Sequence, residues 1–296
     1  MRYFLILLLS IVVFNVKAGD DDQARELKAR GFIVQMLSED PKILALLQKD
    51  KDPNKLTTYR KNIRESNDLI KKAVTRFWKH HKTVLYKTKA EIEAMKAAEE
   101  EKKKKLRKHY AVMSMDFFSE RVKTREESAV LTDQQYTGDG NYLFIRFWEG
   151  IQFVYTSIPH VIPTEADLVY AVRYLSNQIE GMEYGKDITK LCEENAPQMR
   201  SKTLLLTAWQ ASQLEAKDWE KYYPYPHKIV SQTEIDKAIV NADPNFAVIV
   251  YSDQSDTVVL KTMVLTGTGQ FAGYITDIKR NPITKKELKE LVKYSQ

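Results

Sequence analysis

The chain has 296 residues and a formal net charge of +6, with 43% hydrophobic and 10% aromatic residues. This composition can fill packed cores and excludes a wholly disordered chain, and the length corresponds to about two domains of ordinary size. Only 10 glycines and 9 prolines are present, which argues against an all-β sandwich with its many turns. We therefore expect a helical or α/β architecture.

The first 18 residues have the pattern of a secretory signal peptide. Met1 and Arg2 give a positive start, residues 3–14 are almost wholly apolar, and Ala18 stands at the expected cleavage position. A retained membrane anchor needs ~20 apolar residues, which is more than this run offers. We predict removal of the signal, export to the periplasm or the exterior, and no membrane span in the mature chain.

Cysteine usage favours a bacterial envelope protein. Cys192 is the only cysteine, so an exported chain has no internal disulfide, and no N-x-S/T acceptor is present. In the sequence KLCEENA we expect Cys192 to be a partly buried helix residue rather than a reactive thiol. Basic residues are concentrated in the first half, but export argues against nucleic acid, and a solvated lysine-rich surface explains them more simply.

Residues 19–66 are predicted to form a helical N-terminal segment. A loose apolar stripe favours helix over residues 20–49, with Pro41 starting a new helix within that stretch. Pro53 is placed to start the next helix, which a seven-residue apolar spacing extends to residue 81.

Residues 67–184 and 185–296 are each predicted to form an α/β unit. In the first, Thr88 and Glu91 have capping-box spacing after a short strand, and Thr164 precedes an apolar helix. The run NYLFIRFWEGIQFVYTSIP is typical of a β-hairpin turning at Glu149-Gly150. In the second, apolar runs alternate with amphipathic segments, as in βαβ units. The expected fold class is α/β, with mixed sheets flanked by helices.

The two units share an order of elements that suggests a duplication. Lys82-Thr83-Val84-Leu85 recurs as Lys202-Thr203-Leu204-Leu205, and Thr164 before a helix recurs at the same spacing as Thr284. The order βαβ, hairpin and helix also resembles that of thioredoxin. The chain has no CxxC, so this resemblance implies topology alone.

No sequence motif indicates a reaction or a cofactor. A dinucleotide fingerprint after a strand, a phosphate-binding loop and a serine nucleophile elbow are all absent. The five histidines are scattered, and His80 and His81 would point about 100° apart on a helix, so we expect no metal. Carboxylate pairs such as Glu193-Glu194 are common on protein surfaces. We therefore expect neither a cofactor nor a catalytic residue that can be named.

The position of some residues at the ends of predicted strands suggests a binding site. Ligands of parallel sheets bind at the carboxyl ends of the strands, where helices begin. In the second unit those ends carry the candidate ligand-binding residues Trp209, Ser231, Tyr251 and Asp253. Helix capping by Ser231 and packing of Trp209 on its own sheet are the structural alternatives.

The segment WEKYYPY is the second candidate region. Its aromatic residues Trp219, Tyr222, Tyr223 and Tyr225 have the composition of an interface. Covering the end of the sheet is an equally good explanation.

The hypothesis that the sequence favours is an exported, non-catalytic binding or adaptor protein of a bacterial envelope, with a small-molecule or protein partner. A cleft between the two units is the expected site. One alternative is a hydrolase of an envelope polymer, which requires a buried carboxylate or histidine with a perturbed pKa in a cleft. Another is a structural subunit of an envelope assembly, which requires a large apolar surface patch.

Overall fold

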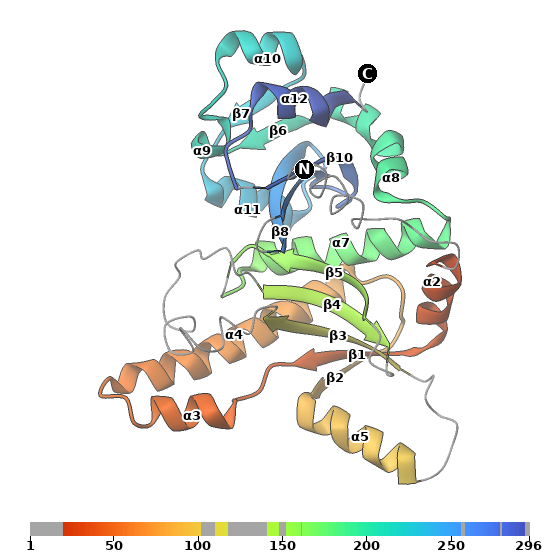
Figure 1. Ribbon diagram of the computed structural model, residues 1–296, viewed down its shortest axis with the longest axis vertical. Coiled ribbons are helices and arrows are strands. Elements are labelled where there is room, and N and C mark those ends of the chain that lie inside the picture. The colour runs from red at the N-terminus through yellow and green to blue at the C-terminus, as the bar shows by residue number, and fades with distance from the viewer. Residues whose placement is uncertain are drawn as a thin grey trace, which may run out of the picture.

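A computed structural model of the chain describes residues 20–101, 110–117, 141–147, 152–160, 162–255, 258–278 and 280–293. Two five-stranded mixed sheets flanked by helices form two similar α/β units, which confirms the predicted fold class (Figure 1). The predicted signal peptide and the Glu149-Gly150 turn lie outside the described residues. Within the described ranges, no helix has the length and apolar character needed to cross a membrane.

The first unit contains a sheet of order β2-β1-β3-β4-β5. Strands β1, β2 and β3 are parallel, and β4 and β5 continue the sheet in antiparallel fashion. Its elements are α2 (Asp20–Ala29), β1 (Gly31–Met36), α3 (Pro41–Leu47), α4 (Pro53–Phe77), β2 (Val84–Thr88), α5 (Lys89–Glu101), β3 (Tyr110–Phe117), β4 (Asn141–Phe147), β5 (Gln152–Ile158) and α7 (Glu165–Glu183).

The second unit contains a sheet of order β10-β9-β8-β6-β7, which is the first order read from the other edge. Here β6, β7 and β8 are parallel and β9 and β10 antiparallel. Its elements are α8 (Ile188–Asn195), the 3-10 helix η1 (Ala196–Ser201), β6 (Thr203–Leu206), α9 (Ala208–Ala211), α10 (Ala216–Tyr222), β7 (His227–Ile229), α11 (Gln232–Asn241), β8 (Phe246–Ser255), β9 (Val258–Leu265), β10 (Phe271–Asp277) and α12 (Lys285–Val292).

The helix predicted over residues 20–49 is wrong for Gly31–Met36, which form β1. Phe32, Ile33 and Val34 are buried between the parallel neighbours β2 and β3. A strand buried on both faces is a continuous apolar run without alternation, so periodicity cannot distinguish it from a buried helix. The first sheet therefore begins inside the N-terminal segment, which is otherwise helical as predicted.

This strand changes which parts of the two units correspond. By sheet position β1 is the equivalent of β6, and the edge strand β2 is the equivalent of the edge strand β7. The match of residues 82–85 with 202–205 therefore compares an edge strand with an inner strand. The match of Thr164 with Thr284 holds, because each caps the helix that follows the last strand of its unit. Common descent of the units stays a prediction.

Helix α7 lies between the two sheets and joins the units into one body (Figure 1). One side packs on β5 and α4, and the other reaches the second unit, where the rings of Tyr174 and Phe271 lie 4.7 Å apart. Arg173 donates a 2.6 Å hydrogen bond to the carbonyl of Thr266. Gly269 adopts φ 74° directly under Arg173, where a Cβ would lie 2.7 Å from its Nε, so this turn requires glycine.

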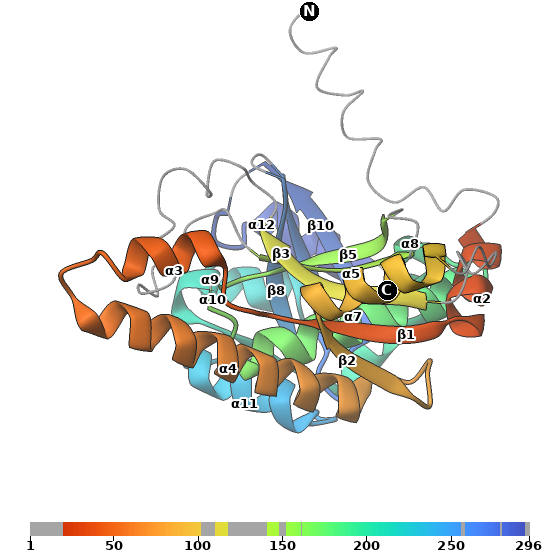
Figure 2. The same cartoon turned by 90° about the horizontal axis from the view of Figure 1, so that it is seen from below.

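The helices α3 and α4 form an arm. In Figure 2, α3 and the first half of α4 extend beyond the sheets. Asp40 caps α3 and Asp52 caps α4, each ahead of a proline at the first turn, which confirms the helix starts at Pro41 and Pro53. The backbone N–H of Asp40 also donates to the Tyr59 hydroxyl at 2.8 Å, which ties the two helices together.

Candidate functional site

A pocket of about 220 Å³ lies between the two units, at the carboxyl end of β6, beside the middle of β8 and the start of α7. The first unit contributes His160 and the N-terminal turns of α7. The second contributes α9, α11, the middle of β8 and Arg280. The polar and aromatic side chains in its wall are His160, Asp167, Tyr170, Thr207, Trp209, Gln210, Gln232, Asp236, Tyr251 and Arg280. The pocket therefore lies both at the strand ends and at the boundary between units, the two places that the sequence suggested.

Trp209 is held at this site by the local structure that follows β6. Thr207 caps α9 with a reciprocal pair of hydrogen bonds to Gln210, at 3.2 and 2.9 Å. The amide of Gln210 then donates to the carbonyl of Ile249 at 2.9 Å, which fixes α9 to β8. Trp209 remains 45% exposed, and its ring centroid lies 5.4 Å from that of Tyr251. Its predicted packing on its own sheet is thus real, but it leaves much of the indole accessible.

Tyr251 forms the floor behind Trp209. It is only 4% exposed, and burial raises the pKa of its hydroxyl above the ordinary value. The guanidinium of Arg280 lies 5.5 Å from the ring centroid, and Nη2 donates to the carbonyl of Tyr251 at 3.3 Å. Burial lowers the pKa of Arg280 to about 10, so it stays charged at neutral pH.

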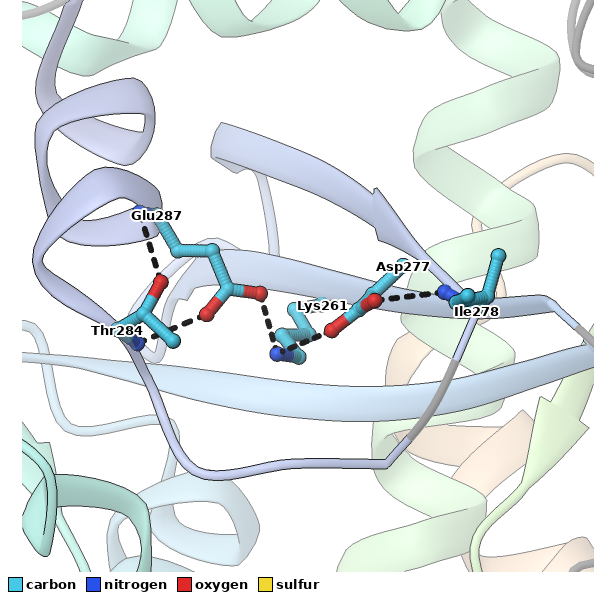
Figure 3. A network of polar contacts seen from close by, with 5 residues as sticks. All are labelled: Lys261, Asp277, Ile278, Thr284 and Glu287. Carbon is cyan, nitrogen blue, oxygen red and sulfur yellow. Dashed lines mark hydrogen bonds and ion pairs between the residues drawn. The ribbon is translucent and has the colours of Figure 1, made fainter. Parts of the chain in front are cut away.

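A buried ion network lies next to Tyr251, and Figure 3 shows its residues. Lys261 is fully buried, and its Nζ lies 5.5 Å from the Tyr251 ring centroid. Lys261 donates to Asp277 at 3.0 Å and to Glu287. Glu287 also accepts from the backbone N–H of Thr284 at 2.8 Å. The network connects β9, β10 and the start of α12, which stiffens the sheet under the pocket.

Two ionisable side chains of the first unit line the pocket: Asp167 in the first turn of α7, and His160 in the segment before that helix. Asp167 Oδ2 lies 2.8 Å from His160 Nδ1 and also accepts from the Thr164 N–H at 2.8 Å. The hydrogen bond to Asp167 raises the pKa of His160 above its usual value, although burial opposes it. Burial raises the pKa of Asp236, and a 2.8 Å hydrogen bond from Gln232 only partly offsets this.

The other predicted ligand-binding residues lie elsewhere. Ser231 caps α11, with a 3.3 Å hydrogen bond from the Glu234 N–H to its hydroxyl, so the capping alternative describes its structural role. Its neighbour Gln232 is the residue that reaches the pocket wall. Asp253 pairs with Val259 in the β8–β9 ladder, and its side chain is outside the described part of the structure.

The aromatic segment of α10 is built into the core of the second unit. Trp219 and Tyr223 are buried, and the indole of Trp219 stacks on His227 at a centroid distance of 4.3 Å. Tyr222 and Tyr225 are partly buried beside them. Covering the sheet thus accounts for Trp219 and Tyr223, and an interface role for the segment stays a prediction.

Three groups in the pocket were not singled out from the sequence: Asp167, Asp236 and Arg280. His160 was counted only among the scattered histidines. His160 and Asp167 are seven residues apart, but Asp236 and Arg280 come from distant parts of the chain, and no local spacing connects them to this pair. Cys192 is buried as predicted, and burial raises the pKa of its thiol to about 12.

Among the residues that the structure describes, no three His, Cys, Asp or Glu side chains gather in a way that could hold a metal ion. The comparisons with protein-family models, curated proteins and solved structures found no match to the chain. Only the geometry of the pocket therefore indicates a function.

Proposed function

We propose that the chain is an exported binding protein of a bacterial envelope, which holds a small molecule in the pocket between its units without changing it chemically. The observation that supports this is the partly exposed Trp209 in a pocket otherwise lined by buried and polar groups. An accessible indole that contacts the Tyr251 ring at a tilt of 53° offers a flat apolar surface at little entropic cost.

The surroundings of Trp209 are suited to binding because they are rigid before a ligand arrives. The Thr207–Gln210 cap shapes the start of α9, and the Gln210–Ile249 and Arg280–Tyr251 bonds fix α9 and Arg280 to β8. A preformed wall avoids the ordering cost that a flexible one adds on binding. The polar groups then provide orientation, as in most small-molecule sites.

Native mass spectrometry of the chain, purified gently from an exporting bacterium, tests this proposal. We expect a co-purifying small mass that is lost in Trp209→Ala and kept in Tyr184→Ala. Tyr184 is a suitable control because it is 67% exposed and follows the opposite end of α7. A mass retained in Trp209→Ala, or no bound mass together with no binding from a metabolite extract, would contradict the proposal.

Export is the part of the proposal that rests on sequence alone. If residues 1–18 are a cleaved signal, N-terminal sequencing of the protein from a periplasmic fraction will begin at Gly19. A protein that keeps Met1 and stays in the cytoplasmic fraction would contradict export, while leaving the binding proposal in place.

A hydrolase is the second candidate, supported by His160 and Asp236. Both have raised pKa values and line one pocket, which is the arrangement that acid–base catalysis needs. The distinguishing variant is Asp236→Asn, which preserves shape but cannot exchange a proton at neutral pH. Loss of turnover of an envelope glycan or peptide in this variant, with ligand binding kept, would favour the enzyme; binding without turnover in the wild type favours the binding protein.

A further inference from the structure

We infer that the ligand of this pocket is a neutral, hydroxyl-rich ring the size of a single sugar unit, packed against the indole of Trp209. The inference rests on the proposed binding function and names its ligand class. Size is the first argument: at about 220 Å³ the pocket is smaller than the ~300–1,000 Å³ typical of sites for drug-sized ligands. One ring with its substituents fits such a space better than an extended molecule.

Charge is the second argument. Asp167 is hydrogen-bonded to His160, so these two groups offset each other when the imidazole is protonated. Asp236 and Arg280 carry the remaining charges of the wall, and these are opposite in sign. A site whose own charges balance gains little from a ligand with net charge, which would also lose its hydration on entry. The balance therefore favours a neutral ligand over a phosphate or a polyamine.

Hydrogen-bonding capacity is the third argument. The amide of Gln232, the carboxylate of Asp236 and the guanidinium of Arg280 are planar groups with several donors or acceptors each, of which the Gln232–Asp236 bond and the Arg280–Tyr251 bond use only a part. Hydroxyls on neighbouring carbon atoms both donate and accept, so they can satisfy such groups without carrying charge. The C–H face of the same ring can lie against the electron-rich face of Trp209. A sugar ring combines these two surfaces in one molecule.

The test compares three classes of probe on the exported full chain by ligand-observed NMR and calorimetry. The probes are neutral monosaccharides (glucose, galactose and N-acetylglucosamine), zwitterionic amino acids (leucine and phenylalanine) and cations (choline and putrescine). We expect at least one monosaccharide to bind, and the amino acids and cations to bind far more weakly.

Variants then test the contacts. Trp209→Ala should weaken monosaccharide binding by about tenfold or more, and Trp209→Phe should restore part of it by returning an aromatic face. Asp236→Asn should change the affinity by less than about threefold, because a hydroxyl can bond to an amide as well as to a carboxylate. Tyr184→Ala should have no effect. Denaturation curves that match the wild type show that each variant is folded.

The results that would contradict the sugar assignment can be distinguished from those that would also contradict the binding function. Binding of amino acids or amines alone, lost in both Trp209→Ala and Asp236→Asn, would overturn the sugar assignment and keep the binding protein. Monosaccharide binding that survives Trp209→Ala would place the sugar outside this pocket and overturn the assignment too. Absence of binding to every probe, with no co-purifying mass, would overturn both.

Discussion

The starts of α7 and α12 use the same local structure for two different purposes. In each, a threonine caps the helix and the acidic residue three positions later bonds back to the threonine N–H at 2.8 Å. In α12 that acid, Glu287, also holds the fully buried Lys261. In α7 that acid, Asp167, also holds His160, whose side chain is 40% exposed at the pocket.

The partners of the two capping acids differ in burial, and this difference indicates which cap has a purely structural role. The Lys261 network has a fully buried lysine and two mostly buried carboxylates and connects two strands with a helix, so its role is to hold the second unit together (Figure 3). The His160 pair lines the pocket, where the imidazole is partly exposed. The acid of the capping box thus binds a lysine in the second unit and a histidine in the first. Of these two partners, only the histidine lines the proposed ligand pocket.

The largest expected effect is on stability, in Lys261→Met. Removing the ammonium leaves Asp277 and Glu287 as poorly solvated carboxylates without their partner, which costs about 3 kcal/mol or more. Urea denaturation of wild type and variant measures this cost. Lys293→Met is the matched control, because its pair with Glu290 is about half exposed and contributes at most about 1 kcal/mol. Equal losses in the two variants would show that the Lys261 network does not hold the second unit together.

Smaller effects are expected from the two caps, in Thr164→Ala and Thr284→Ala. Each removes one N-cap hydrogen bond and should reduce the free energy of unfolding by about 1 kcal/mol. The stability losses should be alike, whereas an NMR titration should separate the variants. Thr164→Ala loosens Asp167 and should move the pKa of His160 towards its ordinary value; Thr284→Ala should leave it unchanged. A shift in both, or in neither, would mean that the α7 cap does not position His160.

The helix caps were the features of the structure that could be predicted most directly from the sequence. Thr88 with Glu91 follows a rule that involves only residues within one helical turn, and the structure has that pair at 2.7 Å. Trp209 and Tyr251, which both line the pocket, were singled out by a rule almost as local, since the carboxyl ends of parallel strands lie at one edge of a sheet. Such rules work because the relevant atoms are near one another in the chain or in a fixed topology.

The misassigned strand and the unforeseen pocket residues depend on contacts that no local rule contains. Phe32, Ile33 and Val34 form a strand because β2 and β3, far along the chain, lie on either side of them. Asp236 and Arg280 share a pocket with His160 because α7 packs against the second unit. Because β1 was assigned to a helix, the sequence comparison matched β2 with β6 instead of β1 with β6. The similar order of elements in the two units could still be recognised.

The smallest expected effect concerns pH: the stability contributed by the His160–Asp167 pair and that contributed by the Lys261–Asp277 pair should change in opposite directions with pH. The folded-state pKa of His160 is raised, so its stabilisation is fully present below the unfolded value of 6.5 and is lost as pH rises through the folded value. Although burial opposes it, the hydrogen bond from Lys261 lowers the pKa of Asp277, so that stabilisation is present above 3.8 and is lost as pH falls further.

Denaturation of wild type, His160→Gln and Lys261→Met across pH measures these two contributions. The difference between wild type and His160→Gln should be at most about 1 kcal/mol, since the imidazole is partly exposed, and should shrink towards alkaline pH. The difference between wild type and Lys261→Met should persist there and shrink only in acid. A His160 contribution that grows with pH would mean that the imidazole is held neutral, and the pocket would then present Asp167 as an uncompensated negative charge. That charge would favour a cationic ligand and argue against a neutral ring.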